Sequence, residues 1–342
     1  MHNDATNRVS ALMGKTQTIR RDKAKKVTVG DLFCGAGLFG QAFRDEGASL
    51  KFAVEMDPHA AASYASNVGS HIRIGKVEHL SPLCNVDVLV AGPPCQGFST
   101  LGRRDPKDVR NKLCLEIPRW AAESKASIVV IENVPPFLKS SQWQELAQLL
   151  SNDGYELATW ELDAVDFGVP QKRRRSFTIA SKIGLPPPPP LIARSATASH
   201  IFKKIKRSDP MHIWPEHSLL AEARMSLLPR NGDRRDILNI KPELCPPSWH
   251  KIGCQATDVW GRMDANAPSN TIRCDFQNPS KGRYIHPTQN RMISLREGAR
   301  LQQIPDHWNL LGHRTAITRQ IGNGVPIGLG QAVARQILSP FS

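Results

Sequence analysis

The fold of this chain is organised around one stretch, Val27-Thr28-Val29-Gly30-Asp31-Leu32-Phe33-Cys34-Gly35-Ala36-Gly37-Leu38-Phe39-Gly40. Its first half, residues 27–33, is an apolar run that predicts a buried parallel strand. The glycines then follow the spacing G-x-G-x-x-G, and residues 41–46 predict a helix. Glycines let a ligand approach the backbone closely, and a helix N-terminus favours electronegative groups. We therefore expect a nucleotide-like cofactor here, because the strand before the turn and the helix after it support an otherwise weak motif.

Reactive side chains follow the next predicted strands. Glu55 ends the apolar run 50–54, where a carboxylate can accept hydrogen bonds from two ribose hydroxyls. Cys95 follows the run 86–91, and Glu132 follows the run 127–131. Ligands of open parallel sheets bind outside the carboxyl ends of the strands. The glycine turn, Glu55, Cys95 and Glu132 are therefore expected on one rim.

The residues around Cys95 indicate a nucleophile. Cys95 lies in Gly92-Pro93-Pro94-Cys95-Gln96-Gly97-Phe98-Ser99 at a strand end, whereas Cys34 lies nearly inside an apolar run. A thiolate is a strong carbon nucleophile, and its pKa falls near cations or free backbone N–H groups. Glu132 can hold or protonate a ring nitrogen.

An arginine-rich segment lies between two further predicted strands. In Gln171-Lys172-Arg173-Arg174-Arg175, strand alternation would place Gln171, Arg173 and Arg175 on one face. Guanidinium groups on that face can orient a carbonyl or a phosphate through their rigid donor forks.

Composition restricts the partners and the compartment. The net charge of +14 favours a polyanionic partner, nucleic acid before a membrane surface, over a merely soluble basic protein. No apolar run approaches the ~20 residues of a transmembrane helix, and residues 1–26 lack the apolar region of a signal peptide. We expect a cytoplasmic protein with free thiols. Cys245, His250, Cys254 and Cys274 lack a C-x-x-C pair, so we expect no metal site.

Together these motifs resemble the bacterial-type DNA cytosine-5 methyltransferase family. The matching stretches keep the family's order and spacing: residues 31–37, 92–99, 132–134, 171–175, 296–302 and 320–326. The Pro-Pro-Cys-Gln motif with the downstream Glu-Asn-Val is highly specific. The resemblance implies an α/β S-adenosylmethionine-dependent methyltransferase fold, Rossmann-like with a mostly parallel sheet. It also implies a smaller irregular target-recognition domain, S-adenosylmethionine as cofactor and double-stranded DNA as partner.

The resemblance also implies roles for single residues. Cys95 would add to carbon 6 of a flipped-out cytosine, which makes carbon 5 nucleophilic towards the methyl group. Glu132 would contact ring nitrogen 3 and the exocyclic amine. Arg175, helped by Arg173, would contact the base carbonyl or the adjacent phosphate. Residues 102–111 resemble the mobile loop that closes over DNA.

The same resemblance implies the binding residues. The cofactor would be held by Phe33, Gly35, Ala36, Gly37, Glu55, Met56, Val77, Pro94, Leu113 and Asn323. DNA would be contacted by Gln96, Ser99, Arg103, Arg104, Gln171, Arg230, Arg234 and Arg235. The chain departs from the family at Leu38, where glycine is common, and at Gln303. It also departs at Lys76, where an aspartate would reach the adenine amine; Lys76 cannot accept that bond, although Glu78 is a substitute acceptor.

Changes in amino-acid composition along the chain predict the domain boundaries. The prolines 186–190 form a stiff boundary, and residues up to Asp258 are polar, basic and irregular. We expect a basic flexible tail at 1–26, a catalytic cofactor-binding domain at 27–183, a target-recognition domain at 184–310 and a C-terminal segment at 311–342 that packs back on the catalytic domain. Ser294 and Glu297 predict a capping box, residues 320–326 predict a turn, and Pro326 begins a last helix.

The leading prediction is sequence-specific DNA cytosine-5 methylation, protecting DNA in a restriction–modification system beside a cognate restriction endonuclease. A monomer suffices, since one chain supplies all catalytic groups. Structured RNA is an alternative substrate, disfavoured by the long basic recognition region. A nicotinamide-dependent oxidoreductase would use the glycine turn and Glu55 but leaves Cys95, Glu132 and the arginines unexplained. A DNA-binding protein without catalysis is disfavoured because the nucleophile, acid and arginines are all present.

Overall fold

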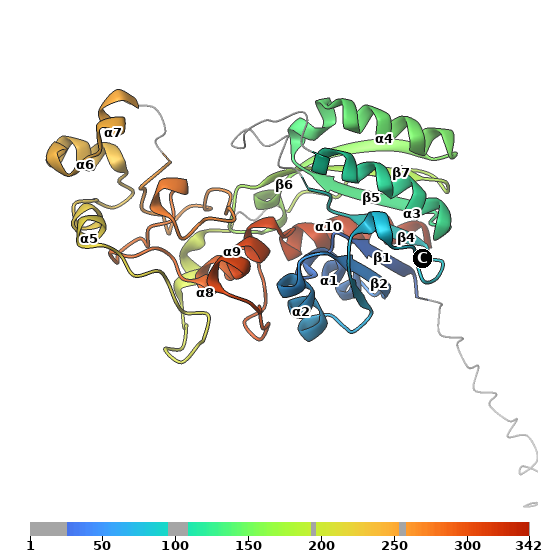
Figure 1. Ribbon diagram of the computed structural model, residues 1–342, viewed down its shortest axis with the longest axis horizontal. Coiled ribbons are helices and arrows are strands. Elements are labelled where there is room, and N and C mark those ends of the chain that lie inside the picture. Colours follow the sequence, from blue (N-terminus) through green and yellow to red (C-terminus); the bar gives the residue numbers. More distant parts are fainter. Residues whose placement is uncertain (1–25, 95–108, 193–195, 253–257, 342) are drawn as a thin grey trace, which may run out of the picture.

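A mostly parallel sheet forms the centre of the computed structural model, which describes residues 26–94, 109–192, 196–252 and 258–341 (Figure 1). Its seven strands follow the order β3-β2-β1-β4-β5-β7-β6. Strands β1 to β5 are mutually parallel, and β7 runs antiparallel to β5 and β6. The strands are β1 Thr28–Leu32, β2 Ser49–Glu55, β3 Ile72–Ile74, β4 Val88–Ala91, β5 Ile128–Asn133, β6 Glu156–Asp163 and β7 Arg174–Ser181. The α/β fold with a mostly parallel sheet, which the resemblance implies, is confirmed.

Helices cover both faces of this sheet (Figure 1). On one face, Phe43 and Val333 share a buried cluster with Val88. On the other face, Trp120 shares a second cluster with Leu89. Val88 and Leu89 are neighbours in β4, and successive side chains of a strand point to opposite faces, so each face acquires its own apolar core. The helices concerned are α1 Leu38–Asp45 and α10 Ile327–Leu338 on the first face, and α3 Ile117–Glu123 and α4 Ser141–Asn152 on the second.

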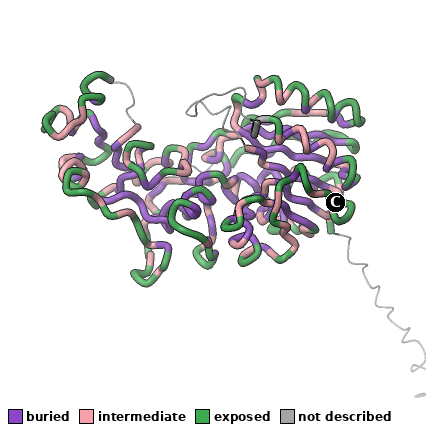
Figure 2. Tube along the Cα trace, in the orientation of Figure 1, coloured by how far each residue is buried: buried purple, intermediate pink, exposed green. Residues whose placement is uncertain are grey.

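The region predicted to be irregular contains short helices. Its long segments without regular structure connect α5 Leu219–Ser226, α6 Arg234–Ile240 and α7 Pro247–Ile252, which lie at the end of the molecule away from the sheet (Figure 1). Nearer the sheet are α2 Pro58–Asn67, α8 Leu295–Leu301 and α9 Arg314–Asn323. Buried residues run from the strands into this neighbourhood (Figure 2). Leu38 and Tyr64 share one apolar cluster with Ile272, Phe276 and Leu301.

The turn predicted at residues 320–326 is wrong in its first half. Helix α9 continues through Asn323, and the chain leaves the helix only at Gly324. A Cβ added at Gly322 would lie 2.5 Å from the backbone nitrogen of Cys274. The helix therefore packs directly against that backbone, and this tertiary contact outweighs the low helix propensity of glycine.

Other predicted boundaries shift by a few residues. The strand expected from Ile72 ends at Ile74, because residues 77–79 form a 3₁₀ turn. A 3₁₀ helix at Val109–Glu116 leads directly into α3, and Pro118 lies in the first turn of α3, where its missing N–H costs nothing. The capping box is confirmed: Ser294 Oγ accepts from the Glu297 amide at 3.1 Å, and Glu297 Oε2 accepts from the Ser294 amide at 2.6 Å.

Candidate active site

The carboxyl edge of the parallel strands brings an acid and an arginine together beside a glycine. Glu132 lies near the end of β5 and is 8% exposed. Its Oε1 lies 2.9 Å from Nε of Arg175 on β7. A Cβ added at Gly92, just beyond β4, would lie 3.8 Å from Glu132 Oε2. Since β4, β5 and β7 are adjacent, the strand order itself places these residues together.

A second group of hydrogen bonds fixes the backbone that leads towards Cys95. The Asn133 side-chain amide donates to the Pro93 carbonyl at 3.3 Å. Ser176 Oγ donates to the Asn133 carbonyl at 3.2 Å. The Gly92 amide donates to the Leu32 carbonyl at 3.2 Å. Neither Asn133 nor Ser176 had a predicted role. Asn133 belongs to the Glu-Asn-Val motif, but only the geometry identifies its bond to the neighbouring strand end.

Several predicted site residues fall outside the part of the chain that the structure describes. These are Cys95, Gln96, Ser99, Arg103 and Arg104. Pro94 and Leu113, predicted to line the cofactor pocket, are both partly buried. The described part of the site is therefore the Glu132–Arg175 pair with the backbone of residues 92–94.

The glycine turn uses backbone conformations that favour glycine. Gly35 and Gly37 have φ angles of 56° and 93°, in the left-handed region. A Cβ at Gly37 would lie 2.6 Å from Val68 Cγ2, whereas a Cβ at Gly35 would meet no atom within 4 Å. Gly37 is thus required for packing, and Gly35 borders open space. Phe33, with φ of 55°, adopts the same unusual region without being glycine.

Glu55 connects the turn to the end of β2. Its Oε2 accepts from the Gly35 amide at 2.8 Å, and its Oε1 accepts from the Met56 and Asp57 amides, both at 2.8 Å. Burial raises the pKa of this carboxyl. A carboxylate has about four acceptor positions, so one remains on Oε2. In this arrangement Glu55 can accept one ribose hydroxyl rather than the predicted two. The open space at Gly35 and this acceptor fit a nucleoside cofactor.

The remaining predicted cofactor residues differ in exposure. Ala36 is buried and Met56 is 58% exposed. Val77 is buried, and its carbonyl accepts from the Trp120 indole N–H at 3.1 Å, which fixes the end of the 3₁₀ turn. Asn323 Oδ1 accepts from the Cys274 thiol at 2.9 Å. Lys76 is exposed and offers no side-chain acceptor to an adenine amine.

Cys34 has the environment of a structural thiol. It is 8% exposed, and burial together with the nearby Asp31 carboxyl raises the pKa of its thiol well above the ordinary value. Raised pKa values make thiols unreactive at neutral pH. This agrees with the interpretation of Cys34 as part of an apolar run.

Gln171, Arg173 and Arg175 were predicted to share one face of the arginine segment. Gln171 and Arg173 lie in the protein interior. Gln171 is fully buried: its Nε2 donates to the Leu301 carbonyl, and its Oε1 accepts from the Ile272 amide. Arg173 is 1% exposed and donates to the carbonyls of Ile272, Gly322 and Gly324 at 2.9–3.1 Å. The expectation of DNA contact by Gln171 and of a base contact assisted by Arg173 does not match these positions. The segment 269–273 covers both side chains.

The predicted DNA-binding arginines of the recognition region also differ in their exposure to solvent. Arg234 is fully buried and donates to the Trp249 carbonyl, so its placement does not match a DNA contact. Arg235 is 47% exposed in its side chain and pairs with Asp233 at 2.8 Å. Arg230 is exposed. Only the last two are accessible to a ligand.

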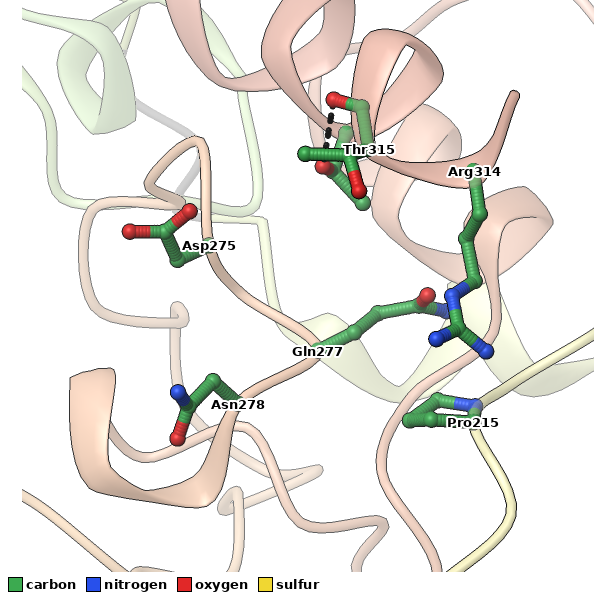
Figure 3. A pocket seen from close by; sticks show the side chains of 7 residues that line it. Pro215, Asp275, Gln277, Asn278, Arg314 and Thr315 are labelled. Atoms are coloured by element: carbon green, nitrogen blue, oxygen red, sulfur yellow. Dashed lines mark hydrogen bonds between the residues drawn. The ribbon is translucent and has the colours of Figure 1, made fainter.

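Two hollows lie outside the Glu132–Arg175 pair. One is lined by residues at the start of α9 and by the segment 275–278, and its lining residues are Pro215, Asp275, Gln277, Asn278, Arg314, Thr315 and Thr318 (Figure 3). The other has a volume of about 260 Å³ and is lined by Lys172, Asp258, Asn270, Thr271, Arg273, Gly282 and Tyr284. Among the described residues, no group of three or more His, Cys, Asp or Glu side chains is arranged to hold a metal ion.

Known proteins resemble this chain in sequence. The sequence matches the family described as C-5 cytosine-specific DNA methylase over residues 27–339. It is 31% identical to the Type II methyltransferase M1.HphI of Haemophilus parahaemolyticus, covering 90% of this chain and 86% of that protein. It is 29% identical to M.DdeI of Desulfomicrobium norvegicum, covering 90% and 87%.

Solved structures share the fold. The structure of a DNA modification methyltransferase from an E. coli prophage matches with a TM-score of 0.67 and 23% identity, covering 92% of this chain and 99% of that one. The Entamoeba histolytica methyltransferase EhMeth matches with a TM-score of 0.68 and 15% identity, covering 93% and 99%.

The fold and the matched sequence define a methyltransferase of the α/β class. The chain belongs to the C-5 cytosine-specific DNA methylase family, and its enzymatic class is DNA cytosine-5 methyltransferase. Within the described residues, none of the helices combines the length and apolarity that crossing a membrane requires.

Proposed function

We propose that the protein methylates carbon 5 of a cytosine in a specific duplex sequence, through a covalent adduct between Cys95 and the flipped-out base. The observation that supports this most is the Glu132–Arg175 pair at 2.9 Å beside Gly92, where the backbone enters the segment that contains Cys95. The base would lie against this pair, with its ring within reach of the thiolate.

The chemistry assigns one task to each group. The Cys95 thiolate adds to carbon 6, and the electrons gained by the ring make carbon 5 nucleophilic. Glu132 holds ring nitrogen 3 and the exocyclic amine while charge develops there. Arg175 fixes the Glu132 carboxylate and presents further N–H groups to the base carbonyl or the adjacent phosphate. After methyl transfer, loss of the carbon-5 proton restores the double bond and releases Cys95.

S-adenosylmethionine, when bound, supplies the methyl group. Glu55 would accept one ribose hydroxyl on its remaining Oε2 position, and the open side of Gly35 would face the cofactor's amino-acid end. Phe33 would pack on the adenine. Met56, exposed at the end of β2, and Asn323 would complete the contacts.

The biological role that we propose is protection of DNA in a restriction–modification system, in the bacterial cytoplasm. Relatives at 29–31% identity carry the name Type II methyltransferase, which motivates this role. A restriction endonuclease that cuts the same sequence would then be the functional partner. The catalytic groups all come from one chain, so the enzyme would act as a monomer.

The test compares substrates. Purified protein is incubated with labelled S-adenosylmethionine and either genomic DNA or transfer RNA, and the label in each nucleic acid is counted. We expect label in DNA and none in RNA. Cys95→Ser should fold normally and transfer none. Label that enters only RNA, or a fully active Cys95→Ser variant, would contradict the proposal.

A further inference from the structure

The hollow beside Lys172 lies on the same side of the sheet as the Glu132–Arg175 pair. Strand β7 is antiparallel to β5, so its first residues lie at the carboxyl end of β5. Lys172 precedes β7 by two residues and extends beyond that edge. Lys172 and Arg175 are three positions apart in the chain, a step that spans at most about 11 Å. One DNA strand has a phosphate every ~3.4 Å along the helix axis. A phosphate close to the target nucleotide is therefore within reach of this hollow.

The walls of the hollow come from a strand pairing across the two predicted domains. The Lys172 amide donates to the Ser269 carbonyl at 2.9 Å, and Thr271 Oγ1 donates to the Lys172 carbonyl at 2.7 Å. This pairing holds Lys172 next to Arg273. Because Gln171 and Arg173 are buried against the same segment, the intervening Lys172 side chain points to the solvent side.

The charges in the hollow favour an anion. Lys172 is exposed, and among the described residues no carboxylate lies within 4 Å of its ammonium group. Arg273 donates through Nη1 to the Lys281 carbonyl at 2.9 Å and through Nη2 to Asp258 at 3.1 Å. Two of its five N–H groups are thus used, and three remain. The hollow of about 260 Å³ has room for several waters or one phosphate group.

Asp258 reduces this positive charge. Its carboxylate is half-exposed and forms the ion pair with Arg273 at the edge of the hollow. Such a pair contributes little stability because water screens it. A DNA phosphate, which also brings the gain of counterion release, can replace the carboxylate on the guanidinium.

We infer that Lys172 and Arg273 form a binding site for a backbone phosphate of the DNA next to the target nucleotide, and that Asp258 competes with this phosphate for Arg273. This inference rests on the proposed function, because it takes duplex DNA as the ligand. It adds Arg273 and Asp258, which belong neither to the family motifs nor to the predicted DNA contacts.

The test measures equilibrium binding of the full chain to an unmethylated, fluorescein-labelled duplex, without cofactor, over a series of salt concentrations. Lys172→Gln and Arg273→Gln should each reduce the slope of log affinity against log salt by roughly 0.9, and weaken binding by about tenfold at 0.1 M salt. Arg273→Lys, which keeps the charge, should retain the slope. Asp258→Asn should tighten binding severalfold.

The matched control is Arg335→Gln, which removes the same charge from an ion pair with Glu46, at the far end of α1. It should leave the slope unchanged. Wild-type slopes in both Lys172→Gln and Arg273→Gln, with thermal unfolding unchanged, would overturn the site. Unchanged or weaker binding by Asp258→Asn would overturn the competition. If the wild-type protein binds DNA with a steep salt dependence but transfers no methyl group, the proposed function is contradicted. The slopes of the variants still decide whether the phosphate site exists.

Discussion

Nε of Arg175 lies 2.9 Å from Oε1 of Glu132, and the two side chains are 13% and 10% exposed. They come from neighbouring antiparallel strands, in which Glu132 is directly opposite Phe177. The pair thus joins the last parallel strand of the sheet to the first antiparallel one, at the edge from which the Cys95 segment departs. A partly desolvated ion pair of this kind is preorganised, so it can stabilise charge on a bound base without rearranging.

Replacing Glu132 by glutamine tests this role. The substitution keeps the size of the side chain but removes the carboxyl group that can hold or protonate ring nitrogen 3 as the ring gains electrons, so we expect kcat to fall by roughly 10²–10³-fold. Methyl transfer and thermal unfolding should be measured together. Glu161→Gln is the matched control, because Glu161 pairs with Arg174 at 3.0 Å on the exposed part of the neighbouring strand. Equal activities of the two variants would contradict the assignment.

Arg173 and Arg175 should separate into a structural and an active-site residue. Arg173→Gln leaves buried carbonyls of Ile272, Gly322 and Gly324 without their donor, at about 1–3 kcal/mol for each unsatisfied group. We expect Tm to fall by about 5–10 °C. Arg175→Gln removes the ion-pair partner of Glu132 but keeps an amide donor beside it, so it should lower Tm less than Arg173→Gln and reduce kcat strongly. An Arg173→Gln variant as stable as the wild type would show that the hydrogen bonds from Arg173 to Ile272 and to the end of α9 do not stabilise the fold.

The sequence predicted the strand ends well because their signals are local. Apolar runs place Glu55 and Glu132 at the ends of β2 and β5, and the glycine spacing predicts the turn that contains Gly35 and Gly37. Alternation in the arginine segment also predicted which side chains share a face. Gln171 and Arg173 are indeed buried, and Lys172 and Arg174 are exposed.

Local patterns failed where a distant segment decides. Gln171 and Arg173 are covered by residues 269–273, about 100 positions later in the chain, so alternation alone could not separate them from Arg175. Arg234 likewise looked accessible in a basic stretch but is buried and donates to the Trp249 carbonyl. The helical ending of α9 depends on packing against the backbone of Cys274.

The two glycines of the turn should respond differently to alanine. At Gly37, with φ of 93°, a Cβ would lie 2.6 Å from Val68 Cγ2, so Gly37→Ala should be strongly destabilised. At Gly35 a Cβ would meet no atom within 4 Å, so Gly35→Ala should lower the free energy of unfolding by only about 1–2 kcal/mol, for its left-handed backbone. It should fold and bind S-adenosylmethionine weakly, because the methyl group enters the space proposed for the cofactor. Calorimetric titration with cofactor measures this, and normal affinity in Gly35→Ala would contradict the cofactor position.

His286 should make stability depend on pH. Burial, assisted by Arg291, lowers the pKa of this imidazole from 6.5 to about 4. Between these values the unfolded chain binds more protons than the folded protein, so the free energy of unfolding falls as the pH falls. The expected loss between pH 7 and pH 5 is about 2 kcal/mol.

His286→Asn should remove this pH dependence while retaining an acceptor near Nδ1 for the Thr288 and Gln289 amides. Urea unfolding at both pH values measures the difference. His307→Asn, on the exposed surface, is the control and should keep the wild-type dependence. A His286→Asn variant that loses the same free energy between pH 7 and pH 5 would assign the dependence to other groups.

The residue roles proposed above all depend on methylation of DNA at carbon 5 of cytosine through Cys95. Bisulfite sequencing of DNA from a methylation-deficient host that expresses the chain tests it most directly. The wild-type protein should protect cytosines in one recurring sequence from conversion, and Cys95→Ser should protect none. Complete conversion with the wild-type protein, or the same protected sequence with Cys95→Ser, would contradict the account.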